Sequence, residues 1–345
     1  MEQKKILVTG GLGFIGSHTV VCLHEAGYTP VIVDNLHNSR IDVLSAIAQL
    51  IGFIPEFIHG DVNDKSLMTE IFAIHNPDAV IHFAAHKAVG ESVDQPLMYY
   101  NNNVVGLVSL LEVMKQADCK KLVFSSSCTV YGEPEQVPVK ESTPTRPAAS
   151  PYGATKQMGE VILKDNKWFE VQCLRYFNPV GAHESSLIGE LPLGVPNNLI
   201  PYLTQTVAGI RPQLTVHGGD YNTPDGTCIR DYIHVMDLAD AHVAAIGRLF
   251  SNPVEHKIEL GDPSLSNFEV FNIGTGHGYS VLEVISAFES ATGEKVPHII
   301  GPRRNGDVVA VWAETTKVNE VLGWKASRNL ETMMRDAWNW QKATS

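Results

Sequence analysis

Seven residues near the start of the chain restrict its possible folds more than any others. The run Gly10-Gly11-Leu12-Gly13-Phe14-Ile15-Gly16 follows a short apolar stretch and opens an amphipathic one. Its glycines satisfy both the G-x-x-G-x-x-G and the G-x-G-x-x-G patterns, which permit a tight strand-to-helix turn and a close approach of the backbone to a pyrophosphate. The helix start then offers unpaired N–H groups and a partial positive charge to that anion. The run predicts a dinucleotide site, and a glycine-rich turn without a ligand is the alternative.

The pattern of apolar residues in the first half supports this interpretation. Short runs rich in Val, Ile and Leu, typical of buried strands, alternate with stretches typical of helices. The expected strands are 5–9, 30–34, 56–59, 79–83, 121–126 and 170–176, and the expected helices are 15–26, 40–50, 66–75, 96–116 and 151–165. Such alternation predicts a Rossmann-type, doubly wound parallel α/β sheet with helices on both faces.

The second half of the chain has a different texture. Segments 187–198 and 218–226 are rich in Gly, Pro and Asn and indicate loops. Helical patterns return at 199–208, 235–249, 281–292 and 315–322. We expect a dinucleotide-binding domain over residues 1–179 and a smaller, loop-rich α/β substrate domain over 180–345. We expect this boundary to be discontinuous, with residues 235–250 packing back on the first domain.

Composition narrows the classes of partner. The 345 residues carry a net charge of −12, which argues against a general binder of nucleic acid or of anionic membranes. We find neither a secretory signal pattern nor an apolar run long enough to cross a bilayer. The five cysteines form no C-x-x-C pair, so we expect reduced thiols in a cytoplasmic protein. We expect no metal site, because His82 and His86 straddle a predicted strand end.

Residues at the ends of the next strands fit a dinucleotide. Asp34 ends the second strand, where a carboxylate accepts hydrogen bonds from ribose hydroxyls and repels a ribose phosphate, which favours NAD over NADP. Arg40 is close enough to weaken that preference. Asp61-Val62 could hold an adenine, and helix capping by Asp61 is the alternative. Phe83-Ala84-Ala85 ends the fourth strand with small residues, which suits close passage of a cofactor.

Tyr152 and Lys156 are candidates for the reaction chemistry. Ser150 and Pro151 predict a helix start, and the candidate pair then shares one helix face. The pKa of a tyrosine is near 10, and lowering it by about three units needs about 4 kcal/mol. We expect the adjacent ammonium and a cationic nicotinamide ring to favour the phenolate. An amphipathic helix with a surface Tyr and Lys is the alternative.

Three consecutive serines, Ser125-Ser126-Ser127, end the fifth strand. Sites on parallel sheets form beyond the carboxyl ends of the strands, and a hydroxyl there can bond the oxygen that loses a proton. We choose Ser127, although spacing alone does not separate it from its two neighbours.

These motifs together resemble those of the extended short-chain dehydrogenase/reductase family, and within it the sugar-nucleotide epimerases. The resemblance runs nearly end to end and rests on the segments VTGGLGFIGSH (8–18), KAVGES (87–92), SPYG (150–153), LRYFNP (174–179), PNNL (196–199) and RDYIH (230–234). It implies that the C4 hydride of a UDP-hexose passes to bound NAD and returns on the other face, which would interconvert UDP-galactose and UDP-glucose in galactose metabolism. Tyr152 would take the hydroxyl proton, Ser127 would bond that oxygen, and Lys156 would hold the nicotinamide ribose. A homodimer built from the helices 96–116 and 151–165 is also implied.

The resemblance further implies the residues around each ligand. Those around the cofactor would be Gly10, Gly13, Phe14, Ile15, Gly16, Asp34, Asn35, Asp61, Val62, Phe83, Ala84, Ala85, Lys87, Asn103, Ser125, Tyr152, Lys156 and Tyr176. Those around the substrate would be Lys87, Ser127, Tyr152, Asn178, Asn197, Asn198, Leu199, Thr215, His217, Arg230, Arg304, Asp307 and Val311. Arginine suits a diphosphate because its planar fork pairs with phosphate oxygens, and a solvated surface pair is the alternative for Arg303-Arg304.

Some positions depart from the family pattern or vary within it. Ala85-His86 stands where close relatives usually have Gly-Leu, and Cys128 stands where Ala is common, but neither change removes a named role. Val311 takes a pocket-wall position that is bulky in some members and small in others. A small residue there suggests that N-acetylated UDP-hexosamines are also accepted.

Two other functions compete with this interpretation. A dehydratase or decarboxylase of the same family would begin with the same C4 oxidation, but dehydratases usually carry Asp-Glu just after the active-site hydroxyl residue. Here Cys128-Thr129 follows Ser127, and the next carboxylate is Glu133. A non-enzymatic NAD-sensing protein would have no use for the tyrosine, lysine and serine together.

Overall fold

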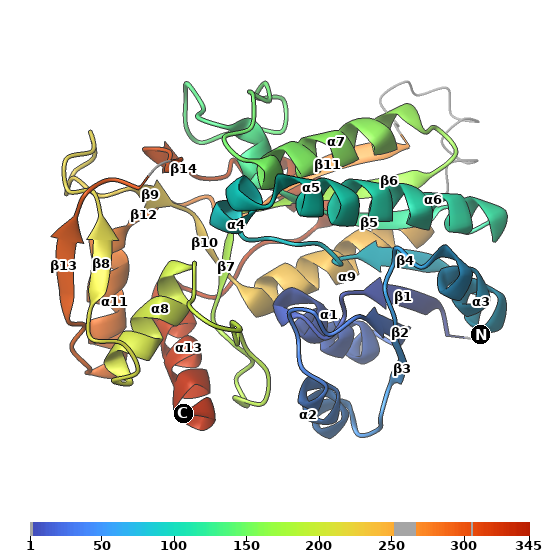
Figure 1. Ribbon diagram of the computed structural model, residues 1–345, viewed down its shortest axis with the longest axis horizontal. Helices are drawn as coiled ribbons and strands as arrows, with labels where there is room; N and C mark the ends of the chain where they lie inside the picture. The colour runs from blue at the N-terminus through green and yellow to red at the C-terminus, as the bar shows by residue number, and fades with distance from the viewer. Residues whose placement is uncertain (1–2, 252–266, 305) are drawn as a thin grey trace.

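A seven-stranded parallel sheet forms the centre of the molecule (Figure 1). The computed structural model describes residues 3–251, 267–304 and 306–345. The strands lie in the order β11-β6-β5-β4-β1-β2-β3. They are β1 (Lys5–Thr9), β2 (Thr29–Asp34), β3 (Glu56–His59), β4 (Ala79–His82), β5 (Lys121–Ser127), β6 (Glu170–Tyr176) and β11 (Phe268–Ile273). The predicted Rossmann-type parallel sheet is confirmed.

Helices cover both faces of this sheet because successive strand residues point to opposite sides. In β1, Ile6 and Val8 enter one core, while Leu7 enters the other. The first core is closed by α1 (Phe14–Glu25), α2 (Asp42–Ile51), α9 (Val235–Ser251) and α12 (Thr316–Leu322). The second is closed by α3 (Lys65–His75), α6 (Gly106–Gln116) and α7 (Pro151–Asp165). Figure 1 shows α6 and α7 on one side of the sheet and α1 and α9 on the other.

A smaller lobe lies beside the carboxyl ends of the strands, at the left of Figure 1. Its core includes Leu203, Phe288, Met334 and Trp338. The helices around this core are α8 (Leu199–Val207), α11 (Val281–Thr292) and α13 (Leu330–Thr344). Short strand pairs accompany them: β7 (Asn178–Val180) with β10 (Tyr232–His234), β8 (Leu214–His217) with β13 (His298–Gly301), and β9 (Ile229–Arg230) with β12 (Tyr279–Ser280) and β14 (Ala310–Val311).

Several elements were not expected from the sequence, among them α13 and the short strands of the smaller lobe. Strand β11 joins the main sheet beside β6, so the second half of the chain completes the sheet of the first. The expected helix 96–116 is interrupted after α5 (Pro96–Tyr99) by a π-helical turn, Tyr100–Val105, and α4 (Val89–Asp94) precedes it. Such turns are often found at functional sites, and this one contains Asn103.

The cysteines and the helices bear on the expectations of reduced thiols and of no membrane crossing. All five cysteines are present as free thiols. Among the described residues, no helix combines the length and the apolar character that a membrane crossing requires.

Candidate active site

The glycine run forms a tight turn between β1 and α1. Gly10 has a φ of +70°, and a Cβ atom at this residue would lie 2.8 Å from the backbone nitrogen of Ala84. At Gly16 a Cβ atom would lie 2.3 Å from the carbonyl oxygen of Gly10. Helix α1 begins without a side-chain cap and without an acidic residue in its first turn. Its free N–H groups therefore fit an anionic group such as a pyrophosphate. The glycines keep the space in front of them clear, because they carry no side chain.

Asp34 is buried at the end of β2, beside this turn. Its carboxylate accepts hydrogen bonds from the backbone N–H groups of Leu12 (3.0 Å) and Leu36 (2.9 Å) and from the hydroxyl of Ser39 (2.8 Å). Arg40 instead pairs with Asp42 on the surface, at 2.6 Å. The carboxylate therefore lies where a ribose would follow the pyrophosphate.

Asp61, after β3, does not cap a helix. Asp64 is the N-cap of α3, because its side chain accepts from the backbone N–H of Leu67. The Asp61 carboxylate accepts instead from Asn35 Nδ2 and from the backbone N–H of Asn63, each at 2.8 Å. Burial raises the pKa of Asp61, but these hydrogen bonds outweigh it and leave the pKa below its ordinary value. The helix-capping alternative for Asp61 is therefore wrong.

The π-helical turn brings Asn103 to the end of β4. Its Nδ2 donates to the carbonyl oxygen of His86 (3.0 Å) and to Thr155 Oγ1 (3.1 Å), and its Oδ1 accepts from the backbone N–H of His86 (2.9 Å). Asn103 thus links the segment after β4 to α7. Lys87, next in that segment, reaches across to Glu190 at 3.1 Å.

Tyr152 and Ser127 meet where α7 begins beside the end of β5. Ser150 caps α7 by accepting from the backbone N–H of Gly153, with Pro151 in the first turn, so the predicted helix start is confirmed. The Ser127 side chain lies close enough to the Tyr152 phenol to lower its pKa, and its Oγ accepts from Thr129 Oγ1 at 3.0 Å. Lys156, one turn further on, is buried, and its Nζ donates to the Ser125 carbonyl oxygen at 2.6 Å.

Strand alternation separates the three serines that spacing alone left equivalent. The Ser126 hydroxyl points away from Tyr152 and donates to Glu160 Oε1 at 2.6 Å. The Ser125 side chain lies near Tyr176, whose pKa it lowers against the larger effect of burial. Of the three hydroxyls, that of Ser127 is therefore the one placed against Tyr152.

The pKa of Tyr152 differs from the expectation. Removal from water raises it to about 12, and the neighbouring Ser127 side chain opposes this only in part. Burial also lowers the pKa of Lys156 to about 8. The Lys156 ammonium bonds to a carbonyl oxygen and lies 5.8 Å from the centre of the Tyr152 ring. The chain's own charges therefore do not produce the phenolate, because desolvation outweighs them.

His242 on α9 is a site neighbour that the sequence analysis missed. Its Nδ1 donates to the Leu238 carbonyl oxygen (2.8 Å), so its Nε2 accepts the Tyr176 hydroxyl (2.5 Å). Burial lowers the pKa of His242 to about 4, which keeps this ring neutral. The sequence offered one signal for this residue, since His242 falls on the apolar face of the helical pattern 235–249.

The candidate diphosphate residues gather around one carboxylate. Arg304 makes a two-pronged contact with Asp307 at 2.9 and 3.2 Å, and Arg230 lies 3.8 Å from the same side chain. Arg303 belongs elsewhere: it pairs with Asp220 and covers the Tyr221 ring, 4.2 Å from its centre. The side chains of Arg303 and Arg304 are 49% and 55% exposed, so a solvated surface position for both remains the alternative.

The other candidate substrate residues are more dispersed. Asn178 lies on β7, and Asn197, Asn198 and Leu199 lie at the start of α8, where Asn198 Nδ2 donates to Glu190 Oε1 at 2.9 Å. Glu190 therefore binds both Lys87 and Asn198, a link that no motif indicated. Thr215 and His217 lie on β8, and among the described residues no hydrogen bond joins them to this group.

Val311 is buried beside the Ser127 segment. On β14 it is in register with Arg230 on β9. It belongs to a small apolar cluster with Tyr131 and Phe177, against which Cys128 packs. Val311 therefore lies between Arg230 and the turn that follows Ser127, and the size of its side chain affects the packing there.

A parallel sheet with a glycine turn after β1, and a tyrosine, a lysine and a serine beside β5, defines a dinucleotide-dependent enzyme of the short-chain dehydrogenase/reductase class. A family model described as GDP-mannose 4,6 dehydratase matches residues 7–337. The UDP-glucose 4-epimerase of Yersinia pestis is 52% identical over 340 residues, which are 97% of each chain. The chain belongs to the UDP-glucose 4-epimerase family.

Solved structures give the same relationship. A UDP-glucose 4-epimerase of Stenotrophomonas maltophila, with NAD and formylated UDP-arabinopyranose bound, is 46% identical, with a TM-score of 0.92 and 99% of each chain covered. That of Bifidobacterium longum, in complex with NAD+ and UDP, is 46% identical, with a TM-score of 0.91 and coverage of 99% of this chain and 98% of the other.

Proposed function

We propose that the protein is an isomerase that interconverts UDP-glucose and UDP-galactose by inverting C4 of the hexose, with tightly bound NAD. The observation that carries this proposal is the placement of Tyr152 beside Ser127 and one helix turn from buried Lys156, at the carboxyl end of the sheet that begins with the glycine turn. Membership of the epimerase family supports it.

The residues described above fit NAD. The uncapped start of α1 would hold the pyrophosphate, and Asp34 the adenosine ribose. Asp61, Val62 and the end of β4 would enclose the adenine and the middle of the cofactor. When bound, NAD supplies the acceptor and donor of the C4 hydride, and its oxidised ring carries a positive charge.

The chain's own residues then move and hold one proton. Tyr152 removes the proton of the 4-hydroxyl group and returns it after the sugar has turned over. Ser127 donates a hydrogen bond to that oxygen. Lys156 would hold the nicotinamide ribose. Without the cofactor the pKa of Tyr152 lies at about 12, so the phenolate needs positive charge beyond that of the chain itself.

Arg230 and Arg304 would bind the diphosphate, with Asp307 orienting both side chains. Both arginines already pair with that carboxylate, so the diphosphate would add to a site whose forks are held in place. Asn178, Asn197, Asn198, Leu199, Thr215 and His217 would surround the uridine and the phosphates. This assignment divides the work between a domain of residues 1–179 that binds NAD and a domain of residues 180–345 that binds the UDP-sugar.

A dehydratase is the second candidate because of the name of the matching family model. Elimination of water needs a carboxylate beside the reacting carbon. Here Glu133 is exposed, and the Glu141 carboxylate accepts from the backbone N–H of Asn272 at 2.9 Å. These positions favour epimerisation.

Incubation with UDP-galactose tests the proposal. We expect UDP-glucose of unchanged mass, with no solvent deuterium at C4 when the reaction runs in D2O, because the hydride stays within the site. Loss of a water mass would indicate a dehydratase. Deuterium at C4 would contradict the hydride route.

Val311 suggests the breadth of the substrate range. We propose that N-acetylated UDP-hexosamines are also accepted, because valine, which packs here with Phe177 and Cys128, is smaller than the bulky residue that some members carry at this position. Val311→Tyr should lower turnover of UDP-N-acetylgalactosamine at least about tenfold more than turnover of UDP-galactose, since the clash concerns only the acetamido group. Coupled assays with both substrates measure this. Equal loss for the two substrates would contradict the proposal.

The exposed apolar side chains on α5, α6 and α7 support a homodimer. Leu97 is 82% exposed, Val108 38% and Val161 58%. We propose that these helices pair with a second copy, since contiguous apolar patches mark interfaces. The free thiols support a reducing, cytoplasmic setting, in which the enzyme would serve galactose metabolism.

A further inference from the structure

A buried ion pair joins the helix that carries Tyr152 and Lys156 to the main sheet. Arg175 on β6 contacts Glu160 on α7 with both arms of its fork, Nε to Oε1 at 2.9 Å and Nη2 to Oε2 at 2.6 Å. The two side chains are 6% and 10% exposed. Among the described residues the pair forms no hydrogen bond with Tyr152 or Lys156, so the mechanism above gives it no role.

Glu160 lies on the same face of α7 as the two candidate catalytic residues. Tyr152, Lys156 and Glu160 are spaced by four residues and therefore share one face of the helix. Glu160 Oε1 accepts the Ser126 hydroxyl at 2.6 Å, and Lys156 Nζ donates to the Ser125 carbonyl oxygen, also at 2.6 Å. Adjacent residues of β5 thus fix adjacent turns of α7.

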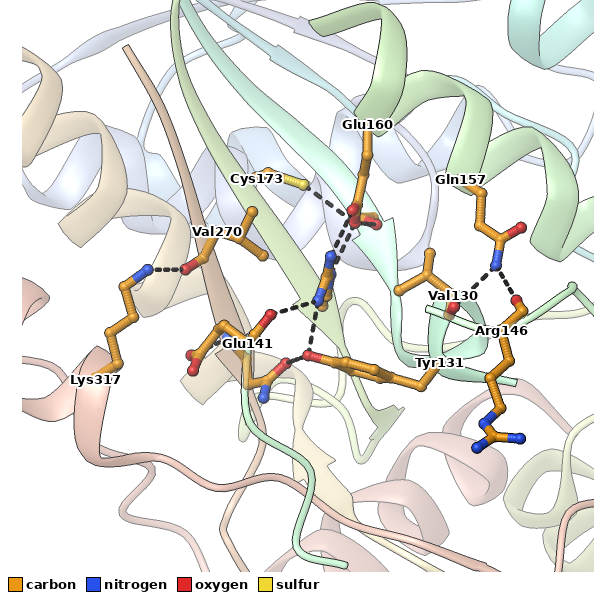
Figure 2. Close-up of polar contacts among 12 residues, drawn as sticks. Val130, Tyr131, Glu141, Arg146, Gln157, Glu160, Cys173, Val270 and Lys317 are labelled. Carbon is orange, nitrogen blue, oxygen red and sulfur yellow. Dashed lines mark hydrogen bonds and ion pairs between the residues drawn. The ribbon is translucent and has the colours of Figure 1, made fainter. Parts of the chain in front are cut away.

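The other side of the guanidinium holds the segment that follows Ser127. Arg175 Nη1 donates to Tyr131 Oη at 2.9 Å, and Tyr131 ends the short 3₁₀ turn Cys128–Tyr131. Gln157 on α7 donates to the Val130 carbonyl oxygen in the same turn, at 2.9 Å. Figure 2 shows Glu160 and Gln157 pointing from the helix toward this network, with Tyr131 and Glu141 on its other side. One arginine therefore connects the helix that carries Tyr152 to the turn that follows Ser127.

We propose that Glu160 and Arg175 are positioning residues, which set the register of α7 on β5 and thereby the approach of Tyr152 to Ser127. Burying an ion pair costs desolvation that its attraction seldom repays, so stability alone is a weak reason for it. A catalytic pair, in contrast, loses rate steeply when it is displaced by about 1 Å. This inference rests on the proposed epimerase function.

Glu160→Gln tests the inference, because it keeps the size of the side chain and removes the charge. We expect kcat with UDP-galactose to fall about tenfold to a hundredfold, while KM and the retained dinucleotide stay near their wild-type values. The pKa on the acidic limb of the kcat–pH profile should rise, because a displaced α7 moves Tyr152 away from Ser127, whose side chain lowers the pKa of Tyr152. A merely structural role would not move that limb.

The pair Arg248–Glu269 provides the matched control. It is also two-pronged, with contacts of 2.8 and 2.7 Å and exposures of 14% and 11%, but it joins α9 to β11. Glu269→Gln should lower the unfolding midpoint and leave the kcat–pH profile unchanged. A Glu160→Gln variant that behaves in the same way would overturn the inference.

Two further variants keep the test decisive. Glu160→Leu with Arg175→Met leaves no buried charge unpaired, so we expect its stability to recover but its kcat to stay low; recovery of both would indicate a structural role only. If Glu160→Gln does not fold, Ser126→Ala replaces it, and a wild-type kcat and pH profile in that variant would overturn the inference. A wild-type protein without epimerase turnover would refute the proposed function instead.

Discussion

The phenol of Tyr152 is subject to two opposing effects. Desolvation raises its pKa to about 12, and the neighbouring Ser127 side chain opposes this rise. Lys156 adds little in the chain alone, because burial brings its own pKa down to about 8 and its ammonium faces a carbonyl oxygen. In the proposed mechanism the phenolate would therefore depend on the positive charge of the oxidised cofactor, so proton removal would be coupled to the presence of the hydride acceptor.

Replacing Tyr152 by Phe removes the hydroxyl of the proposed base and keeps its ring. We expect kcat to fall by about 10²–10⁴, the usual contribution of general-base catalysis, with NAD retained. Steady-state turnover of UDP-galactose and the absorbance of released dinucleotide measure the two quantities. Tyr202→Phe on α8 is the control and should be silent. Full turnover in Tyr152→Phe would remove the base assignment.

At the scale of elements, the turn from β1 to α1 has the least tolerance for change. Gly16→Ala would force a Cβ atom to within 2.3 Å of the Gly10 carbonyl oxygen, so the turn must open and its N–H groups lose their common direction. We expect the purified variant to lack most of its dinucleotide while the sheet stays folded. Ultraviolet spectra of the denatured protein measure the loss.

Gly27→Ala separates this effect from ordinary backbone strain. Gly27 has a φ of +85° but no atom within 4 Å of the added Cβ, so the substitution costs about 1–2 kcal/mol without closing a site. It should lower stability and keep the dinucleotide. If both Gly16→Ala and Gly27→Ala lost the dinucleotide, the loss would come from general backbone strain and not from the opened turn.

The same scale shows what sequence reasoning can reach. Strands β1 to β6 were predictable because their apolar runs are short and continuous, and α7 because Ser150 and Pro151 mark its start. Strand β11 was missed because it pairs with β6 across a long separation in sequence. The π-helical turn at Asn103 shifts backbone hydrogen bonds and leaves the side-chain pattern unchanged. Glu160–Arg175 and Tyr176–His242 were missed because each joins residues that become neighbours only when helices pack on the sheet.

For the whole molecule, the buried histidines determine how the fold responds to acid. His18, His82 and His242 are at most 4% exposed, and burial lowers their pKa values to about 3, 3 and 4. In the unfolded chain each would titrate near 6.5. Between about pH 6.5 and pH 4 the unfolded state therefore binds more protons than the folded state, and acid favours unfolding.

This difference predicts an early and steep loss of stability. Three extra protons correspond to a decrease in the free energy of unfolding of up to about 4 kcal/mol per pH unit below pH 6.5. The carboxyls of Asp231 and Asp240, whose pKa values burial raises, act in the opposite direction at the acid end, so the slope should be steepest between about pH 5.5 and pH 5. Urea unfolding at about pH 7, 6 and 5 measures the slope. His242→Gln, which cannot titrate, should reduce the slope by about a third, whereas a profile that stays flat to pH 5 would show that these rings gain protons without unfolding.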